Sequence, residues 1–121
     1  MRNLILALVA ASTLLPVQAD GGTREKRCGW IANPTPANWN LFDREGRWSI
    51  GEQGRHQARG LRTMPDFDRA EWVTTNVGSY GHGCGCMTVD TDAKTKRVTR
   101  IYVTQQQKLA ICRADRKLPQ W

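Results

Sequence analysis

The sequence lacks most of the motifs that mark enzymes. It contains no Gly-x-Ser-x-Gly elbow, no His-Glu-x-x-His motif and no glycine-rich phosphate-binding loop. Its only two histidines are His56 and His82. The carboxylates that could form a glycosidase-type pair all have simpler roles as caps, turns or solvated charges: Asp66, Asp68, Glu71, Asp90 and Asp92. These absences favour a protein that is not an enzyme and needs no cofactor, and they leave a small hydrolase as the least favoured function.

No part of the sequence concentrates positive charge in a long run. The chain has 18 Lys and Arg against 11 Asp and Glu, a net charge of +7, but the basic residues are scattered as singles and pairs. No nucleic-acid-binding motif is present, so we do not expect nucleic-acid binding. The positive balance fits either simple solubility or an acidic partner, such as an anionic glycan, a lipid headgroup or a protein surface.

Beyond the amino terminus, no apolar stretch approaches the ~20 residues that a transmembrane helix needs. The terminus itself has Arg2, a short apolar segment over residues 4–15, and small residues at Val17 and Ala19. This pattern predicts a signal peptide over residues 1–19, cleaved after Ala19. We therefore expect an exported protein, periplasmic or extracellular, with no membrane span and a net charge one unit lower.

The four cysteines are not arranged as the Cys-x-x-Cys knuckles of zinc sites. In a small exported domain, Cys28, Cys84, Cys86 and Cys112 are predicted to form two disulfides. A metal site that combines them with His82 is a less favoured alternative, so no metal is predicted. Cys84 and Cys86 would share one strand face and could not easily bridge each other. Both are expected to bridge Cys28 and Cys112, and either pairing remains open.

Residues 28–121 are predicted to form a single disulfide-stapled domain after a flexible polar arm at 20–27. The fold class is mainly β, with a small α+β fold also possible: a single antiparallel sheet, or a small sandwich or barrel, with one short helix. That helix is placed at 68–73, because Asp68 and Glu71 fit a capping box.

Three stretches carry the alternation of strands. Residues 39–50 predict a hairpin with its turn at 43–46. Residues 84–89 predict a central strand with cysteines on one face and Met87 and Val89 on the other, paired antiparallel with 97–104. Residues 109–111 are expected to continue the sheet, and the chain from Arg113 onward to be a tail held by a disulfide.

Five tryptophans are present, which is many for a domain of this size. Trp30, Trp39 and Trp48 are spaced like residues on successive strands that face a shared core. Together with Trp72 they are expected mainly to fill that core. Exposed indoles would instead stack on sugar rings or anchor a partner protein, and Trp121 is expected to be exposed.

Two stretches have compositions that packing does not easily explain, residues 51–60 and 80–83. The first places polar side chains between glycines, and the second places Tyr80 and His82 on a strand that is bare on its other face. We predict that the two stretches form one recognition surface. Its residues are Arg55, His56, Gln57, Tyr80 and His82. The alternative is a solvated loop beside a glycine-rich strand end.

Several motifs together resemble one family. They are Cys28-Gly29-Trp30, Asn33-Pro34-Thr35-Pro36-Ala37-Asn38, Trp48-x-Ile50-Gly51, Gln53-Gly54, His56-Gln57-Ala58, Tyr80-Gly81-x-Gly83-Cys84-x-Cys86 and Cys112-Arg113-Ala114-Asp115. The pattern is similar to that of small exported bacterial proteins classed as a domain of unknown function. The resemblance supports export and a single domain, and it implies no activity, substrate or cofactor.

These observations predict a monomeric binding module of the cell envelope. A protein partner, as for an inhibitor or an accessory factor, is the favoured ligand. An envelope glycan or another anionic polymer is the alternative. Binding to a polyanion should weaken as ionic strength rises, whereas a desolvated protein interface should persist.

Overall fold

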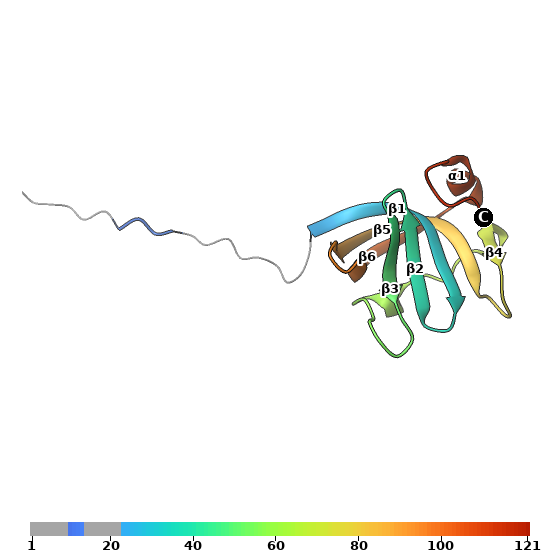
Figure 1. The fold of residues 1–121 in the computed structure, drawn as a ribbon, viewed down its shortest axis with the longest axis horizontal. Helices are drawn as coiled ribbons and strands as arrows, with labels where there is room; N and C mark the ends of the chain where they lie inside the picture. The colour runs from blue at the N-terminus through green and yellow to red at the C-terminus, as the bar shows by residue number, and fades with distance from the viewer. Residues whose placement is uncertain (1–9, 14–22) are drawn as a thin grey trace, which may run out of the picture.

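The computed structural model describes residues 10–13 and 23–121. The domain consists of six strands, two 3₁₀ turns and one short helix (Figure 1). Their bounds are β1 (Thr23–Thr35), β2 (Asn38–Asp43), β3 (Gly46–Gly51), η1 (Leu61–Thr63), η2 (Arg69–Glu71), β4 (Trp72–Thr74), β5 (Gly81–Asp92), β6 (Arg97–Gln107) and α1 (Leu109–Ala114).

The sheet closes on itself. Its strand order is β1-β2-β3-β6-β5-β4, and β1 also pairs antiparallel with β5 from Thr23↔Thr91 to Asn33↔Gly81. Since β5 returns beside β1 after the β1–β2–β3 meander, the connection is a Greek key. Five strands therefore form a small barrel, an architecture that the OB-fold also uses, and β4 extends the sheet beside the start of β5. A shared architecture does not imply a shared function.

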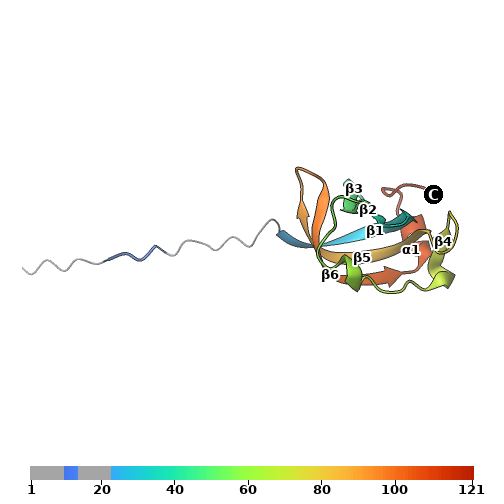
Figure 2. The same cartoon turned by 90° about the horizontal axis from the view of Figure 1, so that it is seen from below.

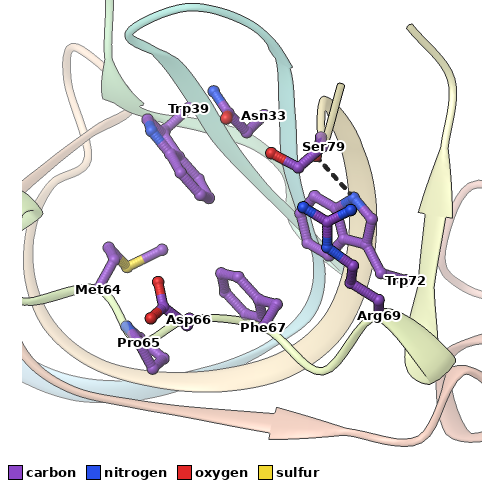
Figure 3. Close-up of a pocket in the computed structure, with 9 residues that line it drawn as sticks. All are labelled: Asn33, Trp39, Met64, Pro65, Asp66, Phe67, Arg69, Trp72 and Ser79. Atoms are coloured by element: carbon purple, nitrogen blue, oxygen red, sulfur yellow. Dashed lines mark hydrogen bonds between the residues drawn. The ribbon is translucent and has the colours of Figure 1, made fainter. Parts of the chain in front are cut away.

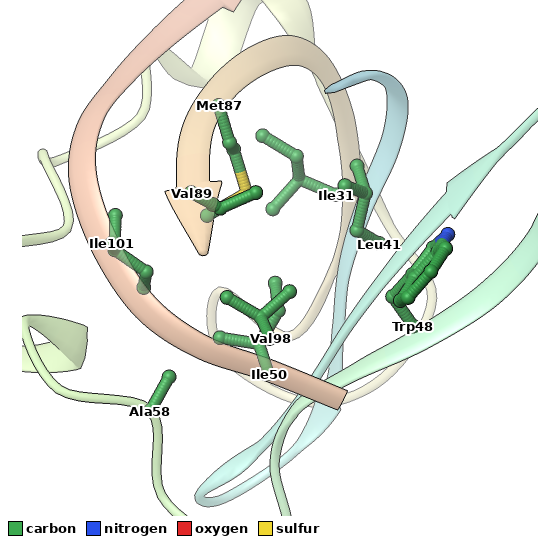
Figure 4. Packing of buried hydrophobic residues seen from close by; sticks show 9 residues of the cluster. All are labelled: Ile31, Leu41, Trp48, Ile50, Ala58, Met87, Val89, Val98 and Ile101. Carbon is green, nitrogen blue, oxygen red and sulfur yellow. The ribbon is translucent and has the colours of Figure 1, made fainter. Parts of the chain in front are cut away.

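The barrel interior is apolar because inward positions alternate along each strand. Ile31, Leu41, Val89 and Val98 are fully buried there. Figure 4 shows them with the other members of the cluster, which are Trp48, Ile50, Ala58, Met87 and Ile101. Met87 and Val89 thus lie on the face opposite the cysteines of β5, as the alternation predicts.

A second cluster lies outside the barrel, where α1 packs against β5 and Trp30 of β1 also takes part. Figure 2 shows α1 and β4 together at the end of the domain that is remote from the start of β1. Trp30 is buried in this cluster, whereas Trp48 lies in the first, so the tryptophans do not share one core.

The two disulfides tie these parts together. Cys84–Cys112 fastens α1 to the outer face of β5, and Cys28–Cys86 joins β1 to β5. The structure therefore confirms two disulfides and decides between the two pairings that the sequence leaves open.

A network of ion pairs around Arg27 lies at the end of the barrel where β1 begins. Arg27 donates to Asp43 at 2.7 Å and to Glu25 at 2.9 Å, and its guanidinium lies 4.0 Å from the centre of the Trp48 ring. Burial opposes the charge on Arg27, but the hydrogen bonds with Asp43 and Glu25 outweigh it and raise the Arg27 pKa. Burial likewise works to raise the pKa of Glu25, but hydrogen bonds from Thr91 and Arg27 outweigh it and lower that pKa.

Four details differ from the sequence predictions. Residues 23–27, predicted as part of a flexible arm, form the start of β1 and pair with β5, while residues 20–22 of that arm lie outside the described residues. Residues 109–111 begin the helix α1 instead of continuing the sheet, because Leu109 and Cys112 are spaced to bury one helical face. The capping-box stretch forms only the 3₁₀ turn Arg69–Glu71, capped by Asp68. The sheet is mixed, since β3 and β6 pair in parallel.

Candidate functional site

A pocket of about 340 Å³ opens beside β4 (Figure 3). We call it the aromatic pocket, because Trp39, Phe67 and Trp72 line it as a series of rings. The Phe67 and Trp72 rings stack with their centres 4.9 Å apart, and Trp39 follows 6.1 Å from Phe67. The other lining residues are Asn33, Met64, Pro65, Asp66, Arg69 and Ser79.

Residues 64–71, which supply most of the pocket lining, are held against β6 by hydrogen bonds. Gln106 accepts a hydrogen bond from the Asp68 backbone at 2.6 Å and donates to the Asp68 and Glu71 carbonyls. Thr104 lies within hydrogen-bonding distance of the Met64 sulfur, and Glu71 accepts from the backbone N–H of Leu109 at 2.8 Å. These contacts hold Met64 to Glu71 in place, so this wall of the pocket is formed before any ligand arrives.

Glycines on β5 make room for Trp72, which lines the opposite side of the aromatic pocket. A Cβ on Gly83 would lie 2.7 Å from the Trp72 ring, so only glycine lets that indole approach the strand this closely. The indole N–H of Trp72 donates to the Ser79 carbonyl at 2.9 Å, which fixes the ring. The bare face that the sequence shows at Gly81 and Gly83 is therefore covered by β4 of the same chain.

The rim of the aromatic pocket carries unused polar groups. Asp66 and Arg69 are exposed, and within residues 23–121 their side chains take part in no hydrogen bond or ion pair. The nitrogen of the Asn33 amide is occupied, since it donates to the Thr35 and Asn38 carbonyls. A carboxylate and a guanidinium thus flank stacked aromatic rings and are available to a ligand.

The residues of the predicted recognition surface do not come together. Arg55, His56 and Gln57 lie in the loop after β3, where His56 bonds the Val98 carbonyl at 2.8 Å and Gln57 donates to the Glu52 carbonyl. Val98 pairs with Thr91, near the end of β5. This loop therefore lies at one end of β5.

Tyr80 and His82 lie at the other end of β5. The Tyr80 carbonyl closes the loop before the strand by accepting from Thr75 and Asn76. His82 is 9% exposed and packs edge-on against Trp30 and Trp121. The single surface expected from the sequence is thus not formed, and ligand binding by any of its five residues stays a prediction.

The position of His82 predicts a dependence of stability on pH. Burial, and then the nearby charge of Arg113, lower its pKa below the ordinary 6.5. The unfolded chain therefore binds a proton more readily than the folded one, so the free energy of unfolding should fall as pH drops below about 6.5. Chemical denaturation between pH 7.5 and 5 should show this slope, and His82→Phe, which packs but cannot ionise, should flatten it. An unchanged slope in the variant would assign the effect to other groups.

The sequence contained a partial signal for the aromatic pocket. Trp39 and Trp72 are only partly buried, unlike Trp30 and Trp48, which are each 1% exposed. The large number of tryptophans suggested a site, but strand spacing placed Trp30, Trp39 and Trp48 in a shared core, and Trp72 was expected to join them. Phe67 lies in the irregular segment between η1 and η2, and no periodicity there indicates that it approaches Trp39.

The comparison with protein families agrees with the resemblance seen in the motifs. A family model described as a protein of unknown function, DUF4087, matches residues 22–119. The chain belongs to this family. Neither a curated protein nor a solved structure matches the chain. The matched residues include every strand of the barrel and the lining of the aromatic pocket. Because the family is described as of unknown function, the match assigns no activity, and the function is inferred from the site.

Two further features of the described residues limit which chemistry the site can support. All four cysteines are in disulfides, so none is available as a thiolate ligand, and the described residues contain no group of three or more side chains suited to hold a metal. Among the same residues, no helix is both long and apolar enough to cross a membrane.

Proposed function

We propose that the protein is an exported, non-catalytic binding module that holds a sugar unit of an envelope glycan in the aromatic pocket. The observation that carries this proposal is the combination of stacked rings with an unpaired carboxylate and guanidinium at the rim. Aromatic faces pack against the C–H faces of a pyranose ring, and charged planar groups hydrogen-bond its hydroxyls. The pocket's volume lies in the range typical of small-ligand sites.

Export is part of the proposal. Two disulfides persist in oxidising compartments, and their presence is consistent with a location outside the cytoplasm. The signal peptide proposed for residues 1–19 lies outside the described residues, apart from residues 10–13. An intact-mass measurement of the protein recovered from its host would test cleavage after Ala19.

A partner protein is the second candidate, and one observation favours it. Val77 is 76% exposed in the loop that carries Ser79 to the rim of the aromatic pocket. A partner that placed an apolar side chain in the aromatic pocket and also covered Val77 would use both features, and Trp and Arg are the residues most often central to such interfaces. Substitution of Val77 would then weaken binding, whereas a sugar confined to the pocket would not depend on it.

The direct test uses neutral oligosaccharides, so that net charge plays no part. N-acetylglucosamine tetrasaccharide and cellotetraose would be titrated while tryptophan fluorescence is followed. Arg69→Ala is expected to weaken binding about tenfold, because a hydrogen bond to a charged group contributes ~1.5–3 kcal/mol. Arg62→Ala is the matched control, since Arg62 is exposed on η1 and does not line the pocket.

The outcome separates the two candidates. Binding of either sugar that Arg69→Ala weakens, with the melting temperature unchanged, supports the glycan. If neither sugar binds at millimolar concentration, while a partner captured from an envelope extract is lost with Arg69→Ala and Val77→Ser, the glycan is wrong and the protein partner is favoured.

A further inference from the structure

A second exposed surface has a chemistry that the aromatic pocket does not explain. Cross-strand pairing places Arg24 opposite Asp90, and Asp90 opposite Arg100. Arg59 then forms a parallel bridge with Arg100. Neighbouring strands are ~4.8 Å apart, so these residues form a row about 14 Å long that contains three arginines and one carboxylate. We call this row, with Tyr102, the arginine face.

Tyr102 organises the arginine face. The guanidinium of Arg24 lies 3.7 Å from the centre of the Tyr102 ring and that of Arg100 lies 4.6 Å from it. The Tyr102 hydroxyl donates to Asp90 at 2.7 Å. Cation–π contacts therefore hold two long side chains over one ring, which reduces the entropy they would lose on binding a ligand.

The backbone also brings Arg59 close to Arg100. The Arg59 N–H donates to the Thr99 carbonyl at 3.0 Å, and the Ile101 N–H donates to the Arg59 carbonyl at 2.8 Å. Gly60 follows with φ +84, and a Cβ there would lie 2.5 Å from the Ile101 carbonyl oxygen. The loop is thus pressed against β6, and a hollow of about 420 Å³ opens between Arg59, Thr63, Arg100 and Tyr102.

The fold neutralises the charges on this face only in part, because the row holds a single carboxylate, Asp90, among three arginines. The ion pairs found among residues 23–121 involve Arg27 and Arg44, and Arg24, Arg59 and Arg100 take part in none of them. All three arginines are exposed. Like charges placed directly opposite on neighbouring strands destabilise a sheet, so the pair Arg59 and Arg100 has a cost that a bound anion would relieve.

We propose that the arginine face binds the sulfate or phosphate esters of an anionic polysaccharide, with Arg59 and Arg100 holding one oxyanion between them. Guanidinium groups match the oxygens of such esters with paired hydrogen bonds. Three arginines spread along a row about 14 Å long, with Asp90 between Arg24 and Arg100, fit repeated negative charges along a polymer better than one isolated ion. This site is separate from the aromatic pocket, and it does not rest on the sugar proposed there.

The probe is dextran sulfate, with unmodified dextran as the uncharged control, at low ionic strength. Arg59→Gln combined with Arg100→Gln is expected to weaken binding at least tenfold. The matched control is Arg113→Gln combined with Arg116→Gln, which removes the same charge from exposed positions at the α1 end and should change affinity by less than threefold. The affinity of the unmodified protein should also fall steeply with added salt.

Each result decides the proposal. A selective loss in the first variant, with unchanged melting temperature, supports it. Equal losses in both variants would show that net charge alone drives binding, and tight binding to inorganic sulfate at the same sulfate concentration would show a site for a single ion. Vesicles with anionic phospholipid that bind more tightly than dextran sulfate through Arg59 and Arg100 would assign the face to a membrane. The neutral tetrasaccharide distinguishes the two sites, because the Arg59/Arg100 variant should bind it normally.

Discussion

Replacing Cys84 and Cys112 with alanine is expected to lower the free energy of unfolding by about 3.5 kcal/mol, because their disulfide closes a loop of 28 residues. In a domain of this size the melting temperature should fall by at least about 10 °C. The loss should be concentrated at the carboxyl terminus. There the helix α1 is only six residues long, and its buried residues are Leu109 and Cys112, so the bridge is its covalent attachment to the barrel. The remaining contacts of this end of the chain are non-covalent, chiefly the buried Leu118 and the packing of Trp121 on Trp30.

The matched variant replaces Cys28 and Cys86. That disulfide closes 58 residues and has the larger chain-entropy term, about 4 kcal/mol. However, the strands it joins are also paired from Thr23 to Asn33, so no segment is released when it is removed. Hydrogen exchange should therefore show residues 109–121 opening only in the Cys84/Cys112 variant. Equal protection of this segment in both variants would contradict the role assigned to the Cys84–Cys112 bridge.

The strands were predictable where side chains alternate between an apolar and a polar face. The hairpin of β2 and β3 and the antiparallel pairing of β5 with β6 are confirmed. The start of β1 was missed because Thr23 to Arg27 contain no apolar residue, a composition typical of flexible segments. Its order comes from pairing with β5 and from the contacts of Arg27, both of which join residues distant in sequence.

The helix α1 and the two sites depend on contacts that periodicity does not reveal. The first turn of α1 is supported by Glu71, which accepts from the Leu109 N–H, although a capping box would have directed Glu71 to its own turn. The aromatic pocket and the arginine face both use residues 59–72, whose regular structure is limited to the short turns η1 and η2 and the first residue of β4. The path of this segment along β6 is set by Gly60 and by Gln106, neither of which signals a site in the sequence.

The Arg27–Asp43 ion pair at the end of the barrel should be the most sensitive polar contact among residues 23–121. Asp43 is 7% exposed, and its carboxylate accepts from Arg27 at 2.7 Å, from the Trp48 indole at 3.1 Å and from the Glu45 N–H at 2.9 Å. Asp43→Ala removes all three bonds and leaves the Arg27 charge buried with less compensation. The expected loss is about 3–5 kcal/mol of unfolding free energy, measured by urea denaturation.

Arg44→Ala provides the surface control for Asp43→Ala, because Arg44 pairs with Asp115 at 2.9 Å while 63% exposed. Its loss should cost no more than about 1 kcal/mol. Arg27→Met tests the cause of the larger effect: once the buried cation is removed, a further Asp43→Ala change should cost clearly less than it does alone. If the two changes were simply additive, the penalty would come from the Trp48 and Glu45 bonds, and the Arg27–Asp43 pair would have no special role in closing the barrel.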